Sequence, residues 1–374
     1  MANGTPKTYP KAEVTYLQGV IVFLLAIVAN LAAQLVISIA AEAGAYATHN
    51  ADFADGAYFQ LIAMLVLQLA FLAAVAIYFG VVKKIRPQLS VSLRKPHPSV
   101  ALVAILPVLA VIGFILPTSF FVNALYKRGY PPSDVPLGTP GQAVLGVFVI
   151  VAVAPFTEEL LFRGFLLSGL RKNFSPYIAA LLSAIAFSLM HMSPEQTVYQ
   201  FFLGYACGLA AVQSGSLWAS VIVHAGSNAF SLLLDTRVGK PFNAAFEFLT
   251  KTAWRAAISA VLLAAACGAA IWFICLAVRK LSARAREKQQ PVPLQTATEQ
   301  ENAEASADEV GRQTMRQKTE AVQKYERKTG LAIYLAAIGL CAVLWVFVLV
   351  AGLTGTPAES TESVLPPAVS EEAL

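Results

Sequence analysis

A long apolar run passes directly into ionisable residues in the stretch 144–163, which reads VLGVFVIVAVAPFTEELLFR. Its first half is apolar enough to lie in a bilayer, and its second half carries Glu158, Glu159 and Arg163. An ionisable side chain at mid-bilayer costs from about 2.5 to more than 10 kcal/mol, depending on how the cost is measured. Residues of this kind usually mark a functional site, so the stretch indicates both a membrane fold and a place for chemistry.

Two further apolar runs also carry polar residues. His191 ends the run that contains Phe187, and His224 lies within a third run, four residues before Asn228. A lone histidine at the end of a span is often only an interfacial residue, and a single pair can be structural. Together the three stretches predict a cluster of polar side chains inside the membrane.

The composition of all 374 residues is that of a membrane protein. Hydrophobic residues make up 57% and charged residues 13%, whereas a typical soluble domain has about 25% charged residues. The net charge of +5 is small, and its distribution gives no sign of nucleic-acid binding. The four cysteines lie in apolar runs without metal-ligand spacing, so neither a disulfide framework nor a thiolate metal site is expected.

Windows of about 20 apolar residues predict nine membrane spans. They lie at about 14–41, 58–82, 99–123, 141–171, 176–192, 195–213, 216–235, 253–278 and 331–353. The first is too long for the apolar region of a signal peptide, so we interpret it as an uncleaved span. Pro155 predicts a kink in the fourth. The expected fold is an all-α, polytopic bundle of transmembrane helices, with an eight-span core and a ninth C-terminal span, in the cytoplasmic (plasma) membrane.

The loops between the spans predict the orientation. Lys and Arg gather in 83–95, in 171–175 and after 279, whereas 42–56 carries acidic residues and no Lys or Arg. Basic loops are cytoplasmic by the positive-inside rule, which places the N-terminus inside and, after nine spans, the C-terminus outside. The predicted outer loop 236–252 is mixed in charge.

The chain divides into five segments on these patterns. They are 1–140 with the first three spans, 141–235 with the next four, 236–278 with the eighth, a charged cytoplasmic linker at 279–330, and 331–374 with the ninth span and an acidic tail. We expect the linker to be flexible, with a helix again from Arg312 to Lys328. A tether of about 50 residues reaches on the order of 40 Å, so we expect the ninth span to sit loosely against the core and to be dispensable for its activity.

Helix geometry predicts that the polar residues of different spans meet. Glu158 lies about 15 residues before the turn at 173–176 and His191 lies about 15 residues after it, so both stand a little over 20 Å from that turn. His224 lies about 8 residues after the turn at 213–216, so we expect it nearer to that side of the membrane than Glu158 and His191. Kinks or tilt of the helices are needed to bring the three residues to one depth.

Spacing within two spans predicts which residues share a face. Glu159 and Arg163 are four residues apart and share one face, while Glu158 points about 100° away. His224 and Asn228 are also four apart and could present a ring N–H and an amide to one spot.

The three stretches together resemble the CPBP family, also called Abi or CAAX-protease-like, whose members are intramembrane proteases related to the type II CAAX prenyl endopeptidases. The family's motifs are met by Glu158, Glu159 and Arg163 for Glu-Glu-x-x-x-Arg, by Phe187 and His191 for Phe-x-x-x-His, and by His224 and Asn228 for His-x-x-x-Asn. Three motifs in order, each on its own span, make a specific resemblance over about 141–235.

The resemblance implies an endopeptidase that cuts a peptide bond within or beside the membrane. Glu158 would be the general base that activates water, and His191 would help to hold that water. Arg163 would orient the acidic pair, mainly through Glu159.

The resemblance also assigns the oxyanion site and leaves the metal question open. His224 and Asn228 would stabilise the oxyanion, and the reaction would then need no cofactor. The family has also been read as zinc metalloproteases, with Glu158, His191 and His224 as ligands. The chain has no His-Glu-x-x-His motif, and we favour the metal-free version.

Two alternatives come from other classes of protein. A proton-coupled transporter also buries Glu, His and Arg, but it is expected to show an internal repeat, and the sequence shows none. A non-enzymatic membrane scaffold or immunity protein could keep the fold, but it would not need every polar motif residue intact. The expected partners are the lipid bilayer and a membrane-associated protein or peptide substrate. Whether that substrate is prenylated, a signal peptide, a pheromone or a membrane regulator stays open.

Overall fold

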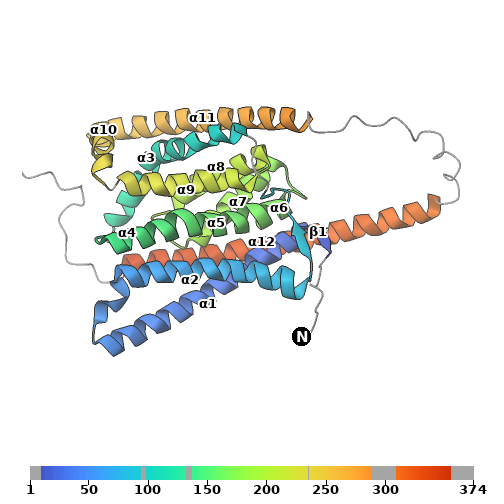
Figure 1. The fold of residues 1–374 in the computed structure, drawn as a ribbon, viewed down its shortest axis with the longest axis horizontal. Helices are drawn as coiled ribbons and strands as arrows, with labels where there is room; N and C mark the ends of the chain where they lie inside the picture. Colours follow the sequence, from blue (N-terminus) through green and yellow to red (C-terminus); the bar gives the residue numbers. More distant parts are fainter. Residues whose placement is uncertain (1–9, 94–97, 132–136, 235, 288–308, 355–374) are drawn as a thin grey trace, which may run out of the picture.

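The computed structural model describes residues 10–93, 98–131, 137–234, 236–287 and 309–354. This part of the chain is almost entirely helical, and its long helices run side by side along one axis (Figure 1). The expected all-α, polytopic bundle is therefore confirmed.

The helices coincide with the predicted spans to within a few residues at most ends. In chain order, the elements are β1 (Lys11–Glu13), α1 (Tyr16–Thr48), η1 (Ala51–Asp55), α2 (Ala57–Ala76), η2 (Ile77–Val82), β2 (Arg86–Gln88), η3 (Pro98–Ile105), α3 (Leu106–Tyr126), α4 (Pro140–Gly146), η4 (Val147–Val153), α5 (Ala154–Glu159), η5 (Leu160–Leu166), α6 (Leu167–Leu170), α7 (Pro176–Met190), α8 (Thr197–Ser214), α9 (Leu217–Leu234), η6 (Arg237–Gly239), α10 (Lys240–Thr250), α11 (Ala253–Glu287) and α12 (Glu309–Thr354). The short helix α10 and the strands β1 and β2 were not predicted.

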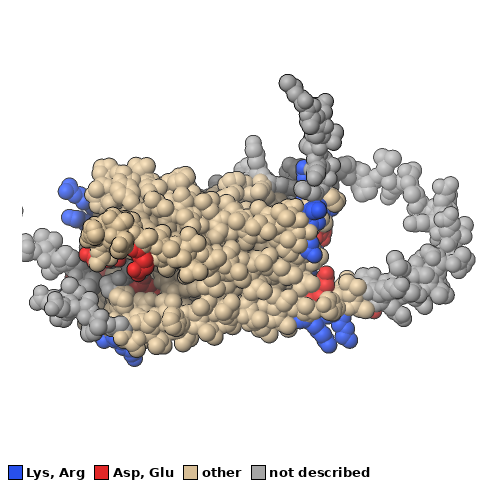
Figure 2. Space-filling view, turned by 90° about the horizontal axis from the view of Figure 1, so that it is seen from below, with Lys and Arg blue, Asp and Glu red and all other residues tan. Residues whose placement is uncertain are grey.

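The protein is an integral membrane protein. Within the described residues, seven helical stretches are long and apolar enough to cross a membrane. They contain α1, α2 with η2, α3, α4 to α6, α9, α11 and α12. Figure 2 shows a broad belt of uncharged residues between two charged ends. The apolar helix α7 has 15 residues, about 22 Å of helix, which is less than the roughly 30 Å of a bilayer core. The count of nine crossings stays a prediction.

The bundle has two distinct ends (Figure 1). At one end, here called the sheet end, β1 and β2 pair in parallel and the turns before α7 and α9 lie. Lys172 of the first turn donates to Glu13, and this hydrogen bond and charge lower the pKa of the exposed Glu13 carboxyl. At the other end, here called the α10 end, lie α10, the connection from α1 to α2 and the start of α4.

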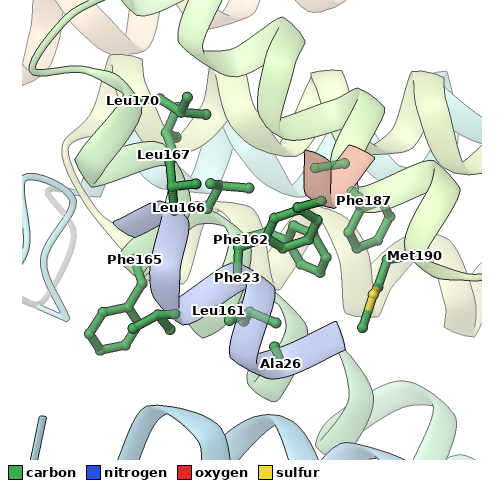
Figure 3. Packing of buried hydrophobic residues seen from close by; sticks show 14 of the residues in the cluster. Phe23, Ala26, Leu161, Phe162, Phe165, Leu166, Leu167, Leu170, Phe187 and Met190 are labelled. Atoms are coloured by element: carbon green, nitrogen blue, oxygen red, sulfur yellow. The ribbon is translucent and has the colours of Figure 1, made fainter. Parts of the chain in front are cut away.

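The main apolar core lies between α1, the α4–α6 helix and α7 (Figure 3). Phe23 of α1 packs against Phe162, whose ring also contacts Phe187 of α7. The backbones of α1 and α6 come close together, since a Cβ added at Gly19 would lie 3.0 Å from Gly169 Cα. Small residues permit such a crossing, and it holds α1 against the helix that carries Glu158.

The ninth predicted span, in α12, is docked on the core. Tyr334 Oη donates to Leu182 O over 2.8 Å, and Trp345 Nε1 donates to Thr197 Oγ1 over 2.6 Å. Tyr334 is also buried in the main core. The expectation of a loosely held ninth span is therefore wrong. Tether length sets only the cost of bringing α12 to the core, whereas side-chain contacts decide whether it stays.

Much of the predicted linker is helical. Helix α11 continues to Glu287, and α12 begins at Glu309, so it includes the helix expected at 312–328. Residues 288–308 of the linker and the acidic tail from 355 lie outside the described residues.

Candidate active site

The two glutamates lie on a helix of irregular register. α5 is six residues long and stands between two π-helical stretches, η4 and η5. Pro155, where a kink was expected, occupies the first turn of α5 directly after η4. Single π-turns inside α-helices occur frequently at functional sites. Here they reset the direction of side chains on either side of Glu158 and Glu159.

Asn228 of α9 binds the backbone of this helix at the irregular place. At the end of η4, Ala154 N–H donates to Val149 O, five residues back. The next donor in that register would be Pro155, which has no N–H and cannot donate to Ile150 O. Asn228 Nδ2 donates to Ile150 O over 2.8 Å instead. The asparagine thus fixes α9 to the helix of the glutamates.

Glu159 is the centre of a buried charged cluster. Its Oε1 accepts from Arg163 Nη1 over 2.7 Å and from His224 Nδ1 over 2.9 Å. Arg163 Nη2 donates to Gly204 O of α8 over 2.7 Å, and its guanidinium lies 4.5 Å from the centre of the Phe187 ring. Glu159 and Arg163 are both fully buried. The hydrogen bonds of this cluster join three helices, the cation–π contact with Phe187 adds α7 as a fourth, and the predicted i,i+4 pair is present within the cluster.

One carboxylate oxygen of Glu158 accepts a hydrogen bond, and the other, here called the open oxygen, has no hydrogen-bond partner among the described atoms. Its Oε1 accepts from Gln68 Nε2 of α2 over 2.7 Å. The amide oxygen of Gln68 in turn accepts from the Thr157 hydroxyl. Among the described atoms, Glu158 Oε2 has no hydrogen-bond partner although it is buried. A buried oxygen of this kind calls for a ligand or a water molecule.

His191 faces the open oxygen of Glu158. His191 Nε2 lies 3.6 Å from Glu158 Oε2, which is too long for a direct hydrogen bond but suits a bridging water. The other ring nitrogen, Nδ1, lies 2.7 Å from Phe187 O. Because a carbonyl oxygen can only accept, Nδ1 carries the hydrogen, and in the neutral ring Nε2 presents a lone pair. The expectation that Glu158 and His191 lie level is met in the structure.

Four of the six predicted residues line one cavity. Glu158, His191, His224 and Asn228 line a cavity of about 1290 Å³, whereas Glu159 and Arg163 are not among its lining residues. The ring N–H of His224 and the amide of Asn228, expected to share one target, have different partners here, Glu159 Oε1 and Ile150 O. Each residue keeps a second polar group, His224 Nε2 and the other amide hydrogen of Asn228.

Sequence reasoning missed Gln68 and Thr157. Gln68 is buried in the middle of an apolar helix, where an unpaired amide costs several kcal/mol by transfer to an apolar medium. A polar residue at such a place is a usable signal, but it does not tell which residue pairs with it.

The side chains expected as alternative zinc ligands do not lie as a metal site requires. Within the described residues, no three His, Cys, Asp or Glu side chains lie so that they could hold a metal ion together. Of the proposed zinc ligands, Glu158 and His191 approach each other, whereas His224 Nδ1 binds Glu159. The described donors do not form a complete zinc site in this arrangement.

Comparison with known proteins agrees with the motifs. Residues 140–230 match the family model described as type II CAAX prenyl endopeptidase Rce1-like, which confirms the resemblance to CAAX-type proteases for this part of the chain. An uncharacterized 24.3 kDa protein of Escherichia coli is 29% identical over 97 residues, which are 25% of this chain and 45% of that protein. The match thus spans less than half of the relative's length. No solved structure gives a significant match.

Proposed function

We propose that this membrane protein is an intramembrane endopeptidase of the CAAX-protease type in which Glu158 activates the attacking water. The observation that supports this most strongly is Glu158 Oε2, a buried oxygen without a hydrogen-bond partner among the described atoms. It lies 3.6 Å from His191 Nε2, and both residues line a large cavity. The family match over residues 140–230 supports a protease in general.

In the proposed reaction, one water lies between Glu158 Oε2 and His191 Nε2. As the water oxygen bonds to the carbonyl carbon of the peptide, Glu158 takes one of its protons and the carbonyl oxygen becomes negative. When the tetrahedral intermediate collapses, the carbon–nitrogen bond breaks and Glu158 returns the proton to the leaving nitrogen. His191 accepts a hydrogen bond from the water and thereby sets its position.

The developing negative oxygen would be stabilised by His224 and Asn228. His224 Nδ1–H donates to Glu159, so Nε2 can donate to a substrate only when the ring is an imidazolium. Glu159 accepts from the Nδ1–H of His224 and so sets the direction of the ring, and Arg163 holds the carboxylate of Glu159 in place. In this proposal Glu159 and Arg163 act on His224 and do not touch the substrate.

Gln68 would position the base. Its amide N–H group holds one oxygen of Glu158, so the other oxygen faces the cavity. The Thr157 hydroxyl contacts the amide oxygen of Gln68, which fixes the way the amide is turned. We further propose that the chemistry needs no resident metal ion, and that the substrate is a membrane-associated protein or peptide.

The test is hydrolysis by the purified protein in ¹⁸O-labelled water, with a mixed peptide library read by mass spectrometry. The wild-type chain should yield fragments whose new carboxyl termini carry ¹⁸O. Glu158→Gln is nearly isosteric but cannot accept the proton, and it should reduce the yield by more than the roughly 10²–10⁴-fold of ordinary acid–base help. Equal yields from a folded Glu158→Gln protein and the wild type would contradict the assignment.

A further inference from the structure

We propose that the cavity is open to the non-cytoplasmic side of the membrane, and that the substrate is a polypeptide segment next to the outer face. This inference rests on the proposed protease function for the nature of the substrate. Its structural part, the side to which the cavity opens, follows from the path of the helices and the placement of charge.

The cavity extends from the candidate active site to the α10 end. Its inner wall contains Glu158 and His191, and its far wall contains Asn243, Phe246 and Thr250 of α10. The lining includes no residue from β1, β2 or the turns before α7 and α9 at the sheet end. Figure 2 shows the molecule hollowed near its left end, which is the α10 end of Figure 1.

The short hairpin of α7 and α8 explains why the space lies at that end. Both helices have one end at the sheet end, where Lys172 binds Glu13 and Leu217 N–H donates to Ser92 O. α7 is 15 residues long, whereas the α4–α6 helix beside it runs for 31 residues. At 1.5 Å per residue, the neighbouring helix is about 24 Å longer. The turn that begins with His191 therefore lies inside the bundle, and beyond it the described part of the chain places no further hairpin in the interior.

The other direction is closed by packed side chains. Phe162, Leu166 and Leu170 follow Glu158 toward the sheet end and are almost fully buried. They belong to the same core as Phe23 and Phe187 (Figure 3). A peptide from the sheet end would have to part this core to reach Glu158.

The placement of Lys and Arg assigns the sheet end to the cytoplasm. Among the described residues, the sheet end carries basic side chains from two connections, from β2 and from the last part of α11, namely Lys83, Lys84, Arg86, Arg171, Lys172, Arg279 and Lys280. The α10 end carries fewer Lys and Arg, and the connection 49–56 at that end has none. The positive-inside rule counts Lys and Arg near the ends of spans, so the cavity faces the opposite, outer side.

The size and chemistry of the cavity suit an extended peptide. Its volume of about 1290 Å³ exceeds the roughly 300–1,000 Å³ of a small-molecule pocket. Asn243, Thr250 and Ser231 offer amide and hydroxyl groups that can bind peptide N–H and C=O groups, while Phe120 and Phe246 offer apolar contacts. The substrate class that fits is the outer juxtamembrane segment of a membrane or exported protein.

Labelling of single introduced cysteines tests the direction directly. Ser231→Cys places a thiol in the cavity, Lys240→Cys places one on the exposed surface of the α10 end, and Lys84→Cys places one at the sheet end. All four native cysteines are buried, so the wild-type chain gives the background. Ser183→Cys, in the fully buried core, is the matched serine control.

A membrane-impermeant sulfonated maleimide is added to spheroplasts and, separately, to inside-out vesicles. The thiols from Ser231→Cys and Lys240→Cys should react in spheroplasts, that from Lys84→Cys only in vesicles, and that from Ser183→Cys only after denaturation. The inference is overturned if Ser231→Cys reacts only in vesicles, if it reacts only after denaturation, or if Lys84→Cys reacts in spheroplasts. Labelling needs no turnover, so a protein without protease activity would contradict the proposed function and still report the direction.

Discussion

Gln68 of α2 donates to Glu158 Oε1 over 2.7 Å and leaves the second oxygen of that carboxylate facing His191. The glutamine comes from a helix far away in sequence and carries no charge, yet it is the residue that sets the direction of the proposed base. A hydrogen bond to a charged group contributes about 1.5–3 kcal/mol, which is enough to decide the orientation of a side chain.

Gln68→Leu should therefore lower kcat by roughly 10- to 100-fold and change KM little, because the base is misdirected while the cavity keeps its shape. The matched control is Gln60→Leu on the same helix, whose amide binds Asp55 O outside the site. Turnover kinetics on any substrate found by the peptide screen would measure both. Equal kcat for the two variants, or a change in KM alone, would contradict the positioning role.

Asn228 should show two separable effects, one on stability and one on turnover. Asn228→Ala leaves Ile150 O without its side-chain donor, at a cost of about 1–3 kcal/mol in the free energy of unfolding. Pro155→Ala restores a main-chain N–H near that carbonyl, so Asn228→Ala should cost less stability in the Pro155→Ala background. Turnover should fall by roughly 10²–10³-fold in both backgrounds if the asparagine also binds the oxyanion.

Thermal unfolding in detergent and turnover, measured on the four proteins of this double-mutant cycle, separate the two roles. Additive losses of stability would show that Asn228 does not compensate for Pro155. Full turnover in any folded Asn228→Ala variant would remove it from the oxyanion site.

Metal dependence gives a third prediction. Purified protein should contain well under one zinc ion per chain, and its activity should survive prolonged chelation, since His224 Nδ1 already binds Glu159 and the described residues supply no complete donor set. Elemental analysis before and after chelation measures this. Stoichiometric zinc that is lost together with activity, and that restores activity when added back, would establish the metalloprotease alternative.

Local patterns in the sequence predicted the helices and part of the site. The Glu159–Arg163 pair follows from spacing along one helix. The approach of Glu158 and His191 follows from the nearly equal lengths of chain on either side of one turn. Both predictions depend only on distances along a regular helix or hairpin.

The parts that were missed depend on contacts between distant segments. Gln68 reaches Glu158 across 90 positions, and β1 pairs with β2 about 75 positions away, without any spacing rule that relates them. The helix α10 escaped notice because its 11 residues are amphipathic and shorter than the roughly 20-residue windows used to find spans. The docking of α12 could not be predicted either, because tether length says nothing about side-chain fit.

That docking changes the expectation for a chain that ends after Arg286, which on sequence grounds should remain active. Trp345 of α12 donates to Thr197 Oγ1, Thr197 Oγ1 donates to Ser193 O, and Ser188 Oγ donates to Thr197 O. These bonds hold both ends of the turn that begins with His191. Loss of α12 should therefore loosen His191 and lower the turnover of a chain that still inserts in the membrane.

A finer change tests the same link without removing the helix. Trp345→Phe keeps the apolar contact but deletes the indole N–H, and a neutral hydrogen bond of about 0.5–1.5 kcal/mol predicts a roughly two- to tenfold lower kcat. Trp254→Phe, at a largely exposed tryptophan near the start of α11, is the matched control and should leave kcat unchanged. The truncated chain should lose more activity than Trp345→Phe, because it also lacks the contact of Tyr334 with Leu182. Wild-type kcat in a truncated chain that is well folded in detergent would show that α12 is an appendage after all.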